Sequence, residues 1–217
     1  YETAIPFVDG ADRFAVASYN EAAKYDPTSP IPFTLLGRTY LGLVDLIDLR
    51  VQQDPKLASG APELKKTALE SAKQNLIRAV ELKSDHAAAE FLLAQAFTRE
   101  GNIDEALRRG MQAAISAPND VGVAFFLGFL FYQKEDLANA EQQFTRAIAI
   151  NPNYSNAMYF LGLIYDKTKR PAEALKQFRR IFELNPDNEE VRKIIVNLEA
   201  GRPALSALPP PPEKRKA

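Results

Sequence analysis

The sequence contains no cysteine and no tryptophan, and His86 is its single histidine. Without cysteine there is no disulfide bond and no thiol chemistry. We expect His86, beside Asp85, in an exposed loop rather than in a catalytic triad or a multi-histidine metal site. The sequence also lacks a glycine-rich phosphate-binding loop and a paired-carboxylate pattern. We therefore predict that the chain is not an enzyme and has no catalytic residues, metal or cofactor.

Strong charge imbalance and long apolar runs are also missing. The formal net charge is −1, so bulk electrostatics does not favour nucleic acid as a partner. No run of eighteen apolar residues occurs, so we predict no membrane insertion by this chain. The composition is that of an ordinary globular protein and leaves the compartment open.

Two segments, 121–154 and 155–188, match each other at an offset of 34 residues. In the second segment Met158, Leu161 and Tyr165 recur at the spacing of one helical face. A fixed period of this length is typical of chains built from stacked supersecondary units, each of which cannot bury its apolar face alone. A plain helical bundle with accidental similarity is the alternative. The aligned pairs are Leu127 with Leu161, Gly128 with Gly162, Phe131 with Tyr165, Ala140 with Ala174, Phe144 with Phe178, and Pro152 with Pro186.

This pattern resembles the tetratricopeptide repeat (TPR). Residues 87–120 fit as a third unit, although they depart from the family at Glu90, where an apolar residue is usual, and at Gly110, where a large residue is usual. The resemblance implies an all-α fold, a right-handed α-α superhelix (TPR solenoid) in which the first helix of each pair lines the concave surface. Gly110 lies within a predicted helix and costs about 1 kcal/mol relative to alanine, so this unit is expected to be the least stable of the three.

The remaining segments are placed around these units. Apolar residues continue helically beyond Tyr40, and Pro62 opens a second helix, so both helices of the unit at 30–86 are predicted to be lengthened into an elongated hairpin. Because the segment before it lacks a first repeat helix and the sequence begins with Tyr1, we expect a fragment of a longer protein. The predicted organisation is an N-terminal strap and partial repeat helix at 1–29, a unit with a helical arm (43–66) at 30–86, repeats at 87–120, 121–154 and 155–188, a capping helix at 189–200, and a disordered Pro-rich basic tail at 201–217.

The resemblance also implies a candidate binding site on the first helices. Helix 121–132 is apolar all round, and such a helix is normally covered on every side. Its rings either belong to the core or line a groove for an extended or helical protein or peptide partner, including the chain's own strap or a second copy. A clamp for an anionic terminus is disfavoured, since Arg38 alone has the required charge. The predicted groove residues are Arg38, Phe91, Gln95, Phe125, Phe126, Phe129, Tyr132, Tyr159, Phe160 and Leu163.

The layout has a second resemblance. The lengthened early unit, the closing stretch at 185–205 and the proline-rich tail are similar to TPR domains of bacterial polytopic membrane proteins related to O-antigen ligases and polymerases. This resemblance implies an alternative function: an accessory domain tethered to a membrane glycan ligase or polymerase, mediating assembly or substrate recognition. Direct glycan binding is disfavoured because tryptophan is absent and few polar groups lie along the predicted groove.

Overall fold

The computed structural model describes residues 10–207, and all regular secondary structure within that range is helical. The helices form two compact units, one ending at Pro118 and one beginning at Asn119. Residues 1–9 of the predicted strap and residues 208–217 of the predicted tail lie outside the described range. The elements are α1 (Gly10–Tyr25), α2 (Pro30–Gln53), the 3-10 helix η2 (Pro55–Ser59), α3 (Ala61–Leu82), α4 (Ala87–Arg99), α5 (Ile103–Ser116), α6 (Val121–Gln133), α7 (Leu137–Ile150), α8 (Ser155–Lys167), α9 (Pro171–Leu184) and α10 (Glu189–Glu199).

Polar side chains fix several helix starts. Asn102, Asp120, Asp136 and Asn188 each accept a hydrogen bond from the backbone N–H three residues further on, at the beginnings of α5, α6, α7 and α10. Each bond satisfies a donor that the first helical turn leaves without an intrahelical partner, which contributes about 1 kcal/mol.

The turn inside each regular helix pair contains one left-handed residue. Gly101, Glu135 and Lys169 have φ values of 82°, 59° and 62°, and they follow one another at the 34-residue period of the sequence. Glycine adopts this conformation freely, whereas other residues pay roughly 1–2 kcal/mol for it. The repeat therefore recurs in the backbone, and Glu135 and Lys169 carry strain that Gly101 avoids.

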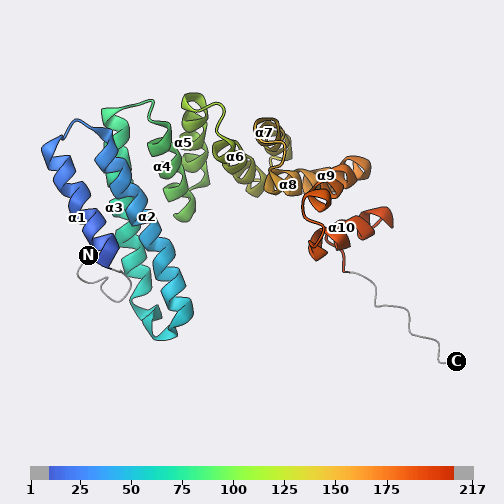
Figure 1. The fold of residues 1–217 in the computed structure, drawn as a ribbon, viewed down its shortest axis with the longest axis horizontal. Helices are drawn as coiled ribbons and strands as arrows, with labels where there is room; N and C mark the ends of the chain where they lie inside the picture. Colours follow the sequence, from blue (N-terminus) through green and yellow to red (C-terminus); the bar gives the residue numbers. More distant parts are fainter. Residues whose placement is uncertain (1–9, 208–217) are drawn as a thin grey trace. The chain divides into compact units, whose positions relative to one another are not determined.

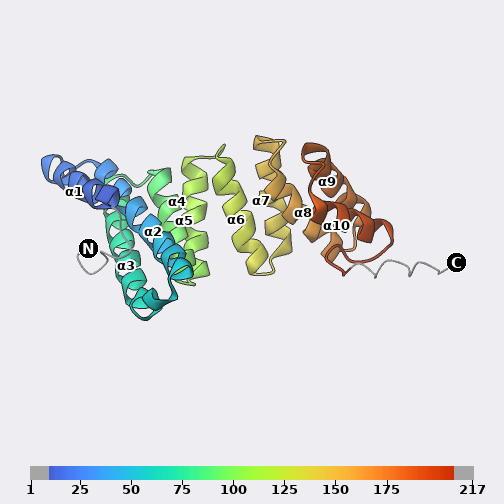
Figure 2. The ribbon, with the colours of Figure 1, turned by 60° about the horizontal axis from the view of Figure 1, so that its bottom comes forward.

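The first unit contains a hairpin longer than its neighbours. Helix α2 has 24 residues and α3 has 22, against 13 and 14 in α4 and α5, and the two long helices lie side by side and extend past the shorter pair (Figures 1 and 2). Leu43, Val44 and Ile47 of α2 pack with Ala61 and Ala68 of α3, so the extension has its own small core. The predicted elongated hairpin is thus confirmed.

Glycine allows the two helices of a regular pair to approach closely. A Cβ atom at Gly128 would lie 2.7 Å from the ring of Phe144, and one at Gly162 would lie 2.6 Å from the ring of Phe178. Both distances are well inside van der Waals contact, and both rings are fully buried. The small and large residues that align in the sequence are therefore partners across each helix pair.

The two departures from the family pattern lie together in the pair α4–α5. Glu90 is buried, with a relative exposure of 3%, and both of its carboxylate oxygens accept hydrogen bonds from Arg109 at 3.3 Å. Gly110, beside Arg109, is also buried. An ion pair thus occupies a position that the family usually fills with an apolar contact.

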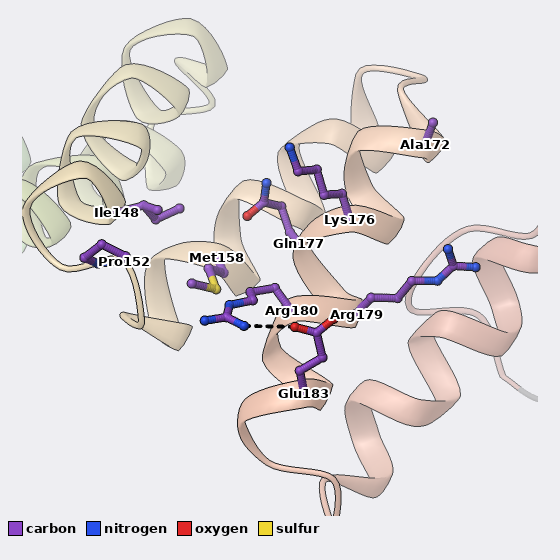
Figure 3. A pocket seen from close by; sticks show the side chains of 9 residues that line it. All are labelled: Ile148, Pro152, Met158, Ala172, Lys176, Gln177, Arg179, Arg180 and Glu183. Carbon is purple, nitrogen blue, oxygen red and sulfur yellow. Dashed lines mark hydrogen bonds and ion pairs between the residues drawn. The ribbon is translucent and has the colours of Figure 1, made fainter.

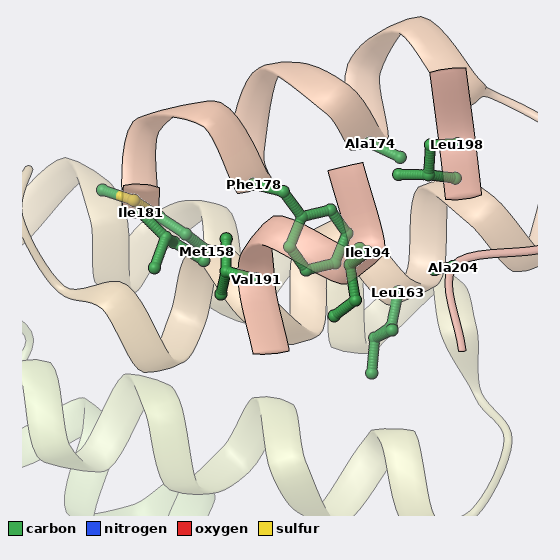
Figure 4. Packing of buried hydrophobic residues seen from close by; sticks show 9 residues of the cluster. All are labelled: Met158, Leu163, Ala174, Phe178, Ile181, Val191, Ile194, Leu198 and Ala204. Atoms are coloured by element: carbon green, nitrogen blue, oxygen red, sulfur yellow. The ribbon is translucent and has the colours of Figure 1, made fainter. Parts of the chain in front are cut away.

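The second unit ends in a capping helix, as predicted. Val191, Ile194 and Leu198 of α10 are buried in one cluster with residues of α8 and α9, including Phe178 (Figure 4). Asn197, a polar residue of the same helix, is also buried, with 1% exposure. The chain after α10 folds back over it, and the carbonyl oxygens of Ala204 and Ser206, in the predicted tail, accept hydrogen bonds from its side-chain amide.

No helix in the described range is both long enough and apolar enough to cross a membrane.

Candidate partner-binding surface

Helix α6 carries more apolar surface than its partner helix covers. Its thirteen residues include no charged side chain. Val123, Ala124, Leu127 and Leu130 are buried, and the face that bears Gly128 meets α7. The aromatic rings of α6 are all half-buried. The helix is therefore not enclosed on all sides, and the side that stays accessible is apolar.

Phe160 of α8 is the centre of a cluster of these rings. Its ring centroid lies 5.9 Å from Phe125, 5.5 Å from Phe129 and 5.3 Å from Tyr132. Tyr159, on α8 itself, lies 5.9 Å away. All four of these contacts are edge-to-face or tilted, an arrangement that contributes about 0.5–1.5 kcal/mol per pair beyond area burial. We call these five residues the aromatic surface.

The aromatic surface is anchored to the buried core from beneath. Phe160 stacks on the buried Phe144 at 5.4 Å, and Phe125 contacts both Phe144 at 5.7 Å and Tyr154 at 5.4 Å. Anchoring of this kind holds the rings in fixed positions. A ligand would therefore meet a preformed surface rather than one that must first be ordered.

Two charged groups border the aromatic surface. The Tyr159 hydroxyl donates a hydrogen bond to Glu190 Oε1 at 2.8 Å. Burial, together with that bond, raises the pKa of Tyr159 to about 12. Lys167 Nζ lies 4.9 Å from the centroid of the Tyr132 ring, a cation–π contact. The border therefore has one acidic and one basic group, each already in contact with a ring.

The other predicted groove residues are placed differently. Leu163 is buried in the core shared by α8 and α10 and is not part of the aromatic surface. Phe126 is half-buried on α6. Arg38 lies exposed on α2, and Phe91 and Gln95 lie half-buried on α4, all three in the first unit.

A separate hollow of about 570 Å³ opens among α7, α8 and α9 (Figure 3). Its floor includes Ile148 and Met158, and basic side chains stand around it. Arg180 is paired with Glu183 at 2.9 Å, and Arg179 is paired with Glu199 of α10 at 2.8 Å. Because these ion pairs neutralise two of its cations, the hollow attracts an anionic ligand less strongly than its basic lining suggests.

His86 lies in the loop before α4, as predicted, but the expected exposure is wrong, because the residue is half-buried. Its Nε2 lies 3.1 Å from the hydroxyl oxygen of the buried Thr34. Burial lowers the pKa of His86 and Lys83 lowers it further, while Asp85 acts in the opposite direction. Within residues 10–207 the structure groups no three His, Asp or Glu side chains that could hold a metal ion.

Comparison with known proteins supports the repeat fold. Two family models, both described as tetratricopeptide repeat, match residues 64–121 and 131–198 and together cover more than half of the chain. The sequence has no significant match among curated proteins.

Solved structures of repeat proteins are similar in fold. MamA from Desulfovibrio magneticus RS-1 matches with a TM-score of 0.64 and 17% identity, covering 83% of this chain and 89% of that one. TTC0263, a TPR protein of Thermus thermophilus, matches with a TM-score of 0.55 and 18% identity over 88% and 92%. YrrB, described as a TPR protein with an unusual peptide-binding site, matches with a TM-score of 0.52 and 18% identity over 78% and 93%. The helix pairs, the 34-residue period and the two model matches together place this chain in the tetratricopeptide repeat family.

Proposed function

We propose that this protein is a non-catalytic interaction scaffold, and that the aromatic surface of α6 and α8 binds an apolar segment of a partner protein. The observation that carries the proposal is the half-burial of five clustered rings: Phe125, Phe129, Tyr132, Tyr159 and Phe160. Clustered exposed apolar groups with a polar border are typical of protein-binding sites, and aromatic residues dominate the binding energy of such sites.

The kind of partner follows from the chemistry of the surface. Its centre is aromatic, and Glu190 and Lys167 at its border are engaged by Tyr159 and Tyr132. A segment that presents apolar side chains in its middle and polar groups at its ends fits this arrangement, either as an amphipathic helix or as an extended strand.

The test is a binding comparison between variants. Peptide ligands are first selected from a random library on the immobilised chain, and their affinity is then measured for wild type, Phe129→Gln and the control Ile115→Gln. Ile115 is 73% exposed on α5 and lies outside the aromatic surface. We expect Phe129→Gln to weaken binding at least about tenfold and Ile115→Gln to leave it unchanged.

Folding is checked in the same experiment by circular dichroism and thermal unfolding. If Phe129→Gln fails to fold, Tyr132→Gln takes its place, since that ring lies near the exposed end of α6. Wild-type affinity in a folded variant of either kind would refute the proposal. The accessory role beside a bacterial glycan ligase or polymerase, self-association and tethering to a membrane protein stay predictions.

A further inference from the structure

The first part of the tail forms a turn that packs against the second unit. The Ser206 N–H donates to the Pro203 carbonyl at 3.0 Å, which closes a four-residue turn. Ala204, the second residue of that turn, is 1% exposed. It belongs to the same cluster as Leu163 of α8 and Leu198 of α10 (Figure 4).

Two polar side chains of the helices hold this turn by its backbone. Asp166 Oδ2 accepts a hydrogen bond from the Ala204 N–H at 2.8 Å. Asn197 Nδ2 donates to the carbonyl oxygens of Ala204 at 3.1 Å and Ser206 at 2.7 Å. Asn197 Oδ1 accepts a further bond from Arg202 Nε at 3.1 Å, so both donors and the oxygen of this buried amide have partners.

These contacts select for shape rather than for sequence. Three of the four hydrogen bonds go to backbone atoms, which any peptide can present in the same turn. The Ala204 side chain fills a closed position in the core, whereas Leu205 beside it is 64% exposed. The arrangement therefore accepts a turn with a small residue at its second position and tolerates any residue at its third.

The polar side chain of Asn197 contributes to the structure only through its hydrogen bonds to the docked tail. It lies among apolar residues on the buried side of α10, where an apolar residue would serve a capping helix as well. An amide buried without partners costs stability, and here the docked turn accepts both of its N–H bonds, while the preceding Arg202 donates to its oxygen.

We infer that Asp166 and Asn197 form a second peptide-binding site, which recognises the backbone of a β-turn with alanine or glycine at its second position and is occupied here by the chain's own residues 203–206. The site goes beyond the proposed function, because it uses hydrogen bonds to backbone rather than the aromatic surface. Both sites share α8, which carries Asp166 one turn beyond Leu163.

The test supplies the turn as a separate peptide. Ala204→Glu in the full chain places a charge at the buried position and ejects the tail, leaving the site open. The probe is the acetylated and amidated peptide Gly-Arg-Pro-Ala-Leu-Ser-Ala, which copies residues 201–207. We expect it to shift the NMR signals of the Asn197 side-chain amide in the variant.

Wild type should bind this peptide at least about tenfold more weakly, since its tethered tail competes at an effective concentration on the order of millimolar. Two altered peptides test the contacts without changing the protein. Methylation of the nitrogen that corresponds to Ala204 removes the bond to Asp166 and should weaken binding at least about tenfold. The Leu205→Ala peptide is the matched control and should bind as the parent does.

A folded Ala204→Glu variant whose Asn197 signals do not respond to millimolar peptide would overturn the inference, as would equal binding of the methylated peptide. If Ala204→Glu does not fold, Asp166→Ala in the full chain replaces it. The Ala204 backbone amide should then exchange with solvent at least about tenfold faster, while the amide of Ile164 stays protected. An unchanged exchange rate at Ala204 would refute the proposed role of Asp166. Phe129→Gln should leave peptide binding at this site intact, which separates it from the aromatic surface.

Discussion

The long hairpin α2–α3 and the short pair α6–α7 differ in how they bury their apolar residues. In the hairpin, added length on both helices lets the extra residues pack on each other, so that Ile47 is fully buried. In the short pair, α6 has apolar residues on every side, but α7 covers only one of them. The comparison teaches that apolar surface is a candidate for partner binding only where packing within the chain leaves it half-buried, as on α6 even with Phe160 of α8 against its rings.

Polar contacts reinforce this difference. On the hairpin, Lys65 pairs with Asp48 at 2.7 Å, and Arg99 of α4 holds Asp45 through bonds of 2.9 and 3.0 Å. These ion pairs tie exposed parts of the hairpin to one another and to α4. Around the aromatic surface, by contrast, the charged groups contact the rings themselves.

The largest effect is expected where a short pair depends on a single ring. Phe178→Ala removes a fully buried side chain that packs on Gly162. It should lower the free energy of unfolding by about 3–5 kcal/mol, measured by urea denaturation. The control Phe14→Ala removes a ring that is 76% exposed on α1 and should change stability by less than about 0.5 kcal/mol. Equal losses would show that the Gly–Phe contact is not what holds the pair.

A buried ion pair in α4–α5 should rank second. Arg109→Leu leaves the buried Glu90 without its main partner, and we expect a loss of about 3 kcal/mol. The neighbouring Arg108 pairs with Glu105 at the surface, with 59% of its side chain exposed, so Arg108→Leu should cost less than about 1 kcal/mol. Thermal unfolding of both variants side by side distinguishes them, and similar midpoints would contradict the burial argument.

Glycine positions sharpen the comparison between the two regions. Gly162→Ala pushes a methyl group against the Phe178 ring and should destabilise by about 1–3 kcal/mol. Gly42→Ala in α2 meets no atom within 4 Å, and should stabilise by roughly 0.5–1 kcal/mol because alanine is the better helix former. Opposite signs in denaturant midpoint are the predicted result. If Gly42→Ala lowers stability, the space beside Gly42 is smaller than the 4 Å clearance indicates.

The period of 34 residues accounts for most of what could be predicted from the sequence. Contacts that recur in each repeat, such as Gly128 with Phe144, leave a regular trace, and so do the helix ends near Pro152 and Pro186. Such a trace indicates both the partner and the face of the helix. The extra length of α2 and α3 is also visible, since it interrupts the period with apolar residues at helical spacing.

The tail contact could not be predicted in this way because it occurs once. Nothing in the repeat indicates that residues 203–206 return to α10. One signal was available: Ile194, Asn197 and Leu198 follow the spacing of a buried helical stripe, in which Asn197 is the polar exception. How far each ring of α6 is buried depends on side-chain packing, which periodicity does not encode.

The smallest change in the free energy of unfolding is expected at the left-handed turn residues. Lys169→Gly relieves a left-handed conformation and should raise stability by roughly 0.5–1 kcal/mol. The same substitution at Lys176, inside α9, should lower stability by about 1 kcal/mol. If both variants lose stability in thermal unfolding, the turn at Lys169 is not strained.

A pH dependence follows from Tyr159. Its pKa is raised to about 12, so the folded state retains its proton above pH 10, where an unfolded tyrosine ionises. Stability from this group is therefore complete below pH 10 and falls as the pH rises from 10 towards 12. Tyr159→Phe should flatten the part of this decline that Tyr159 causes, as followed by thermal unfolding between pH 8 and 11. A slope identical to that of wild type would contradict the assignment.

The most direct measurement of the central claim is an NMR titration of the ¹³C-labelled aromatic rings with a selected peptide ligand. Our account predicts that signals of Phe129, Tyr132 and Phe160 shift together and saturate at one affinity, while the exposed ring of Phe14 stays unchanged. Saturable binding that leaves these three rings unperturbed and instead shifts the side chains of Lys176 and Arg180 around the hollow of α7–α9 would contradict it.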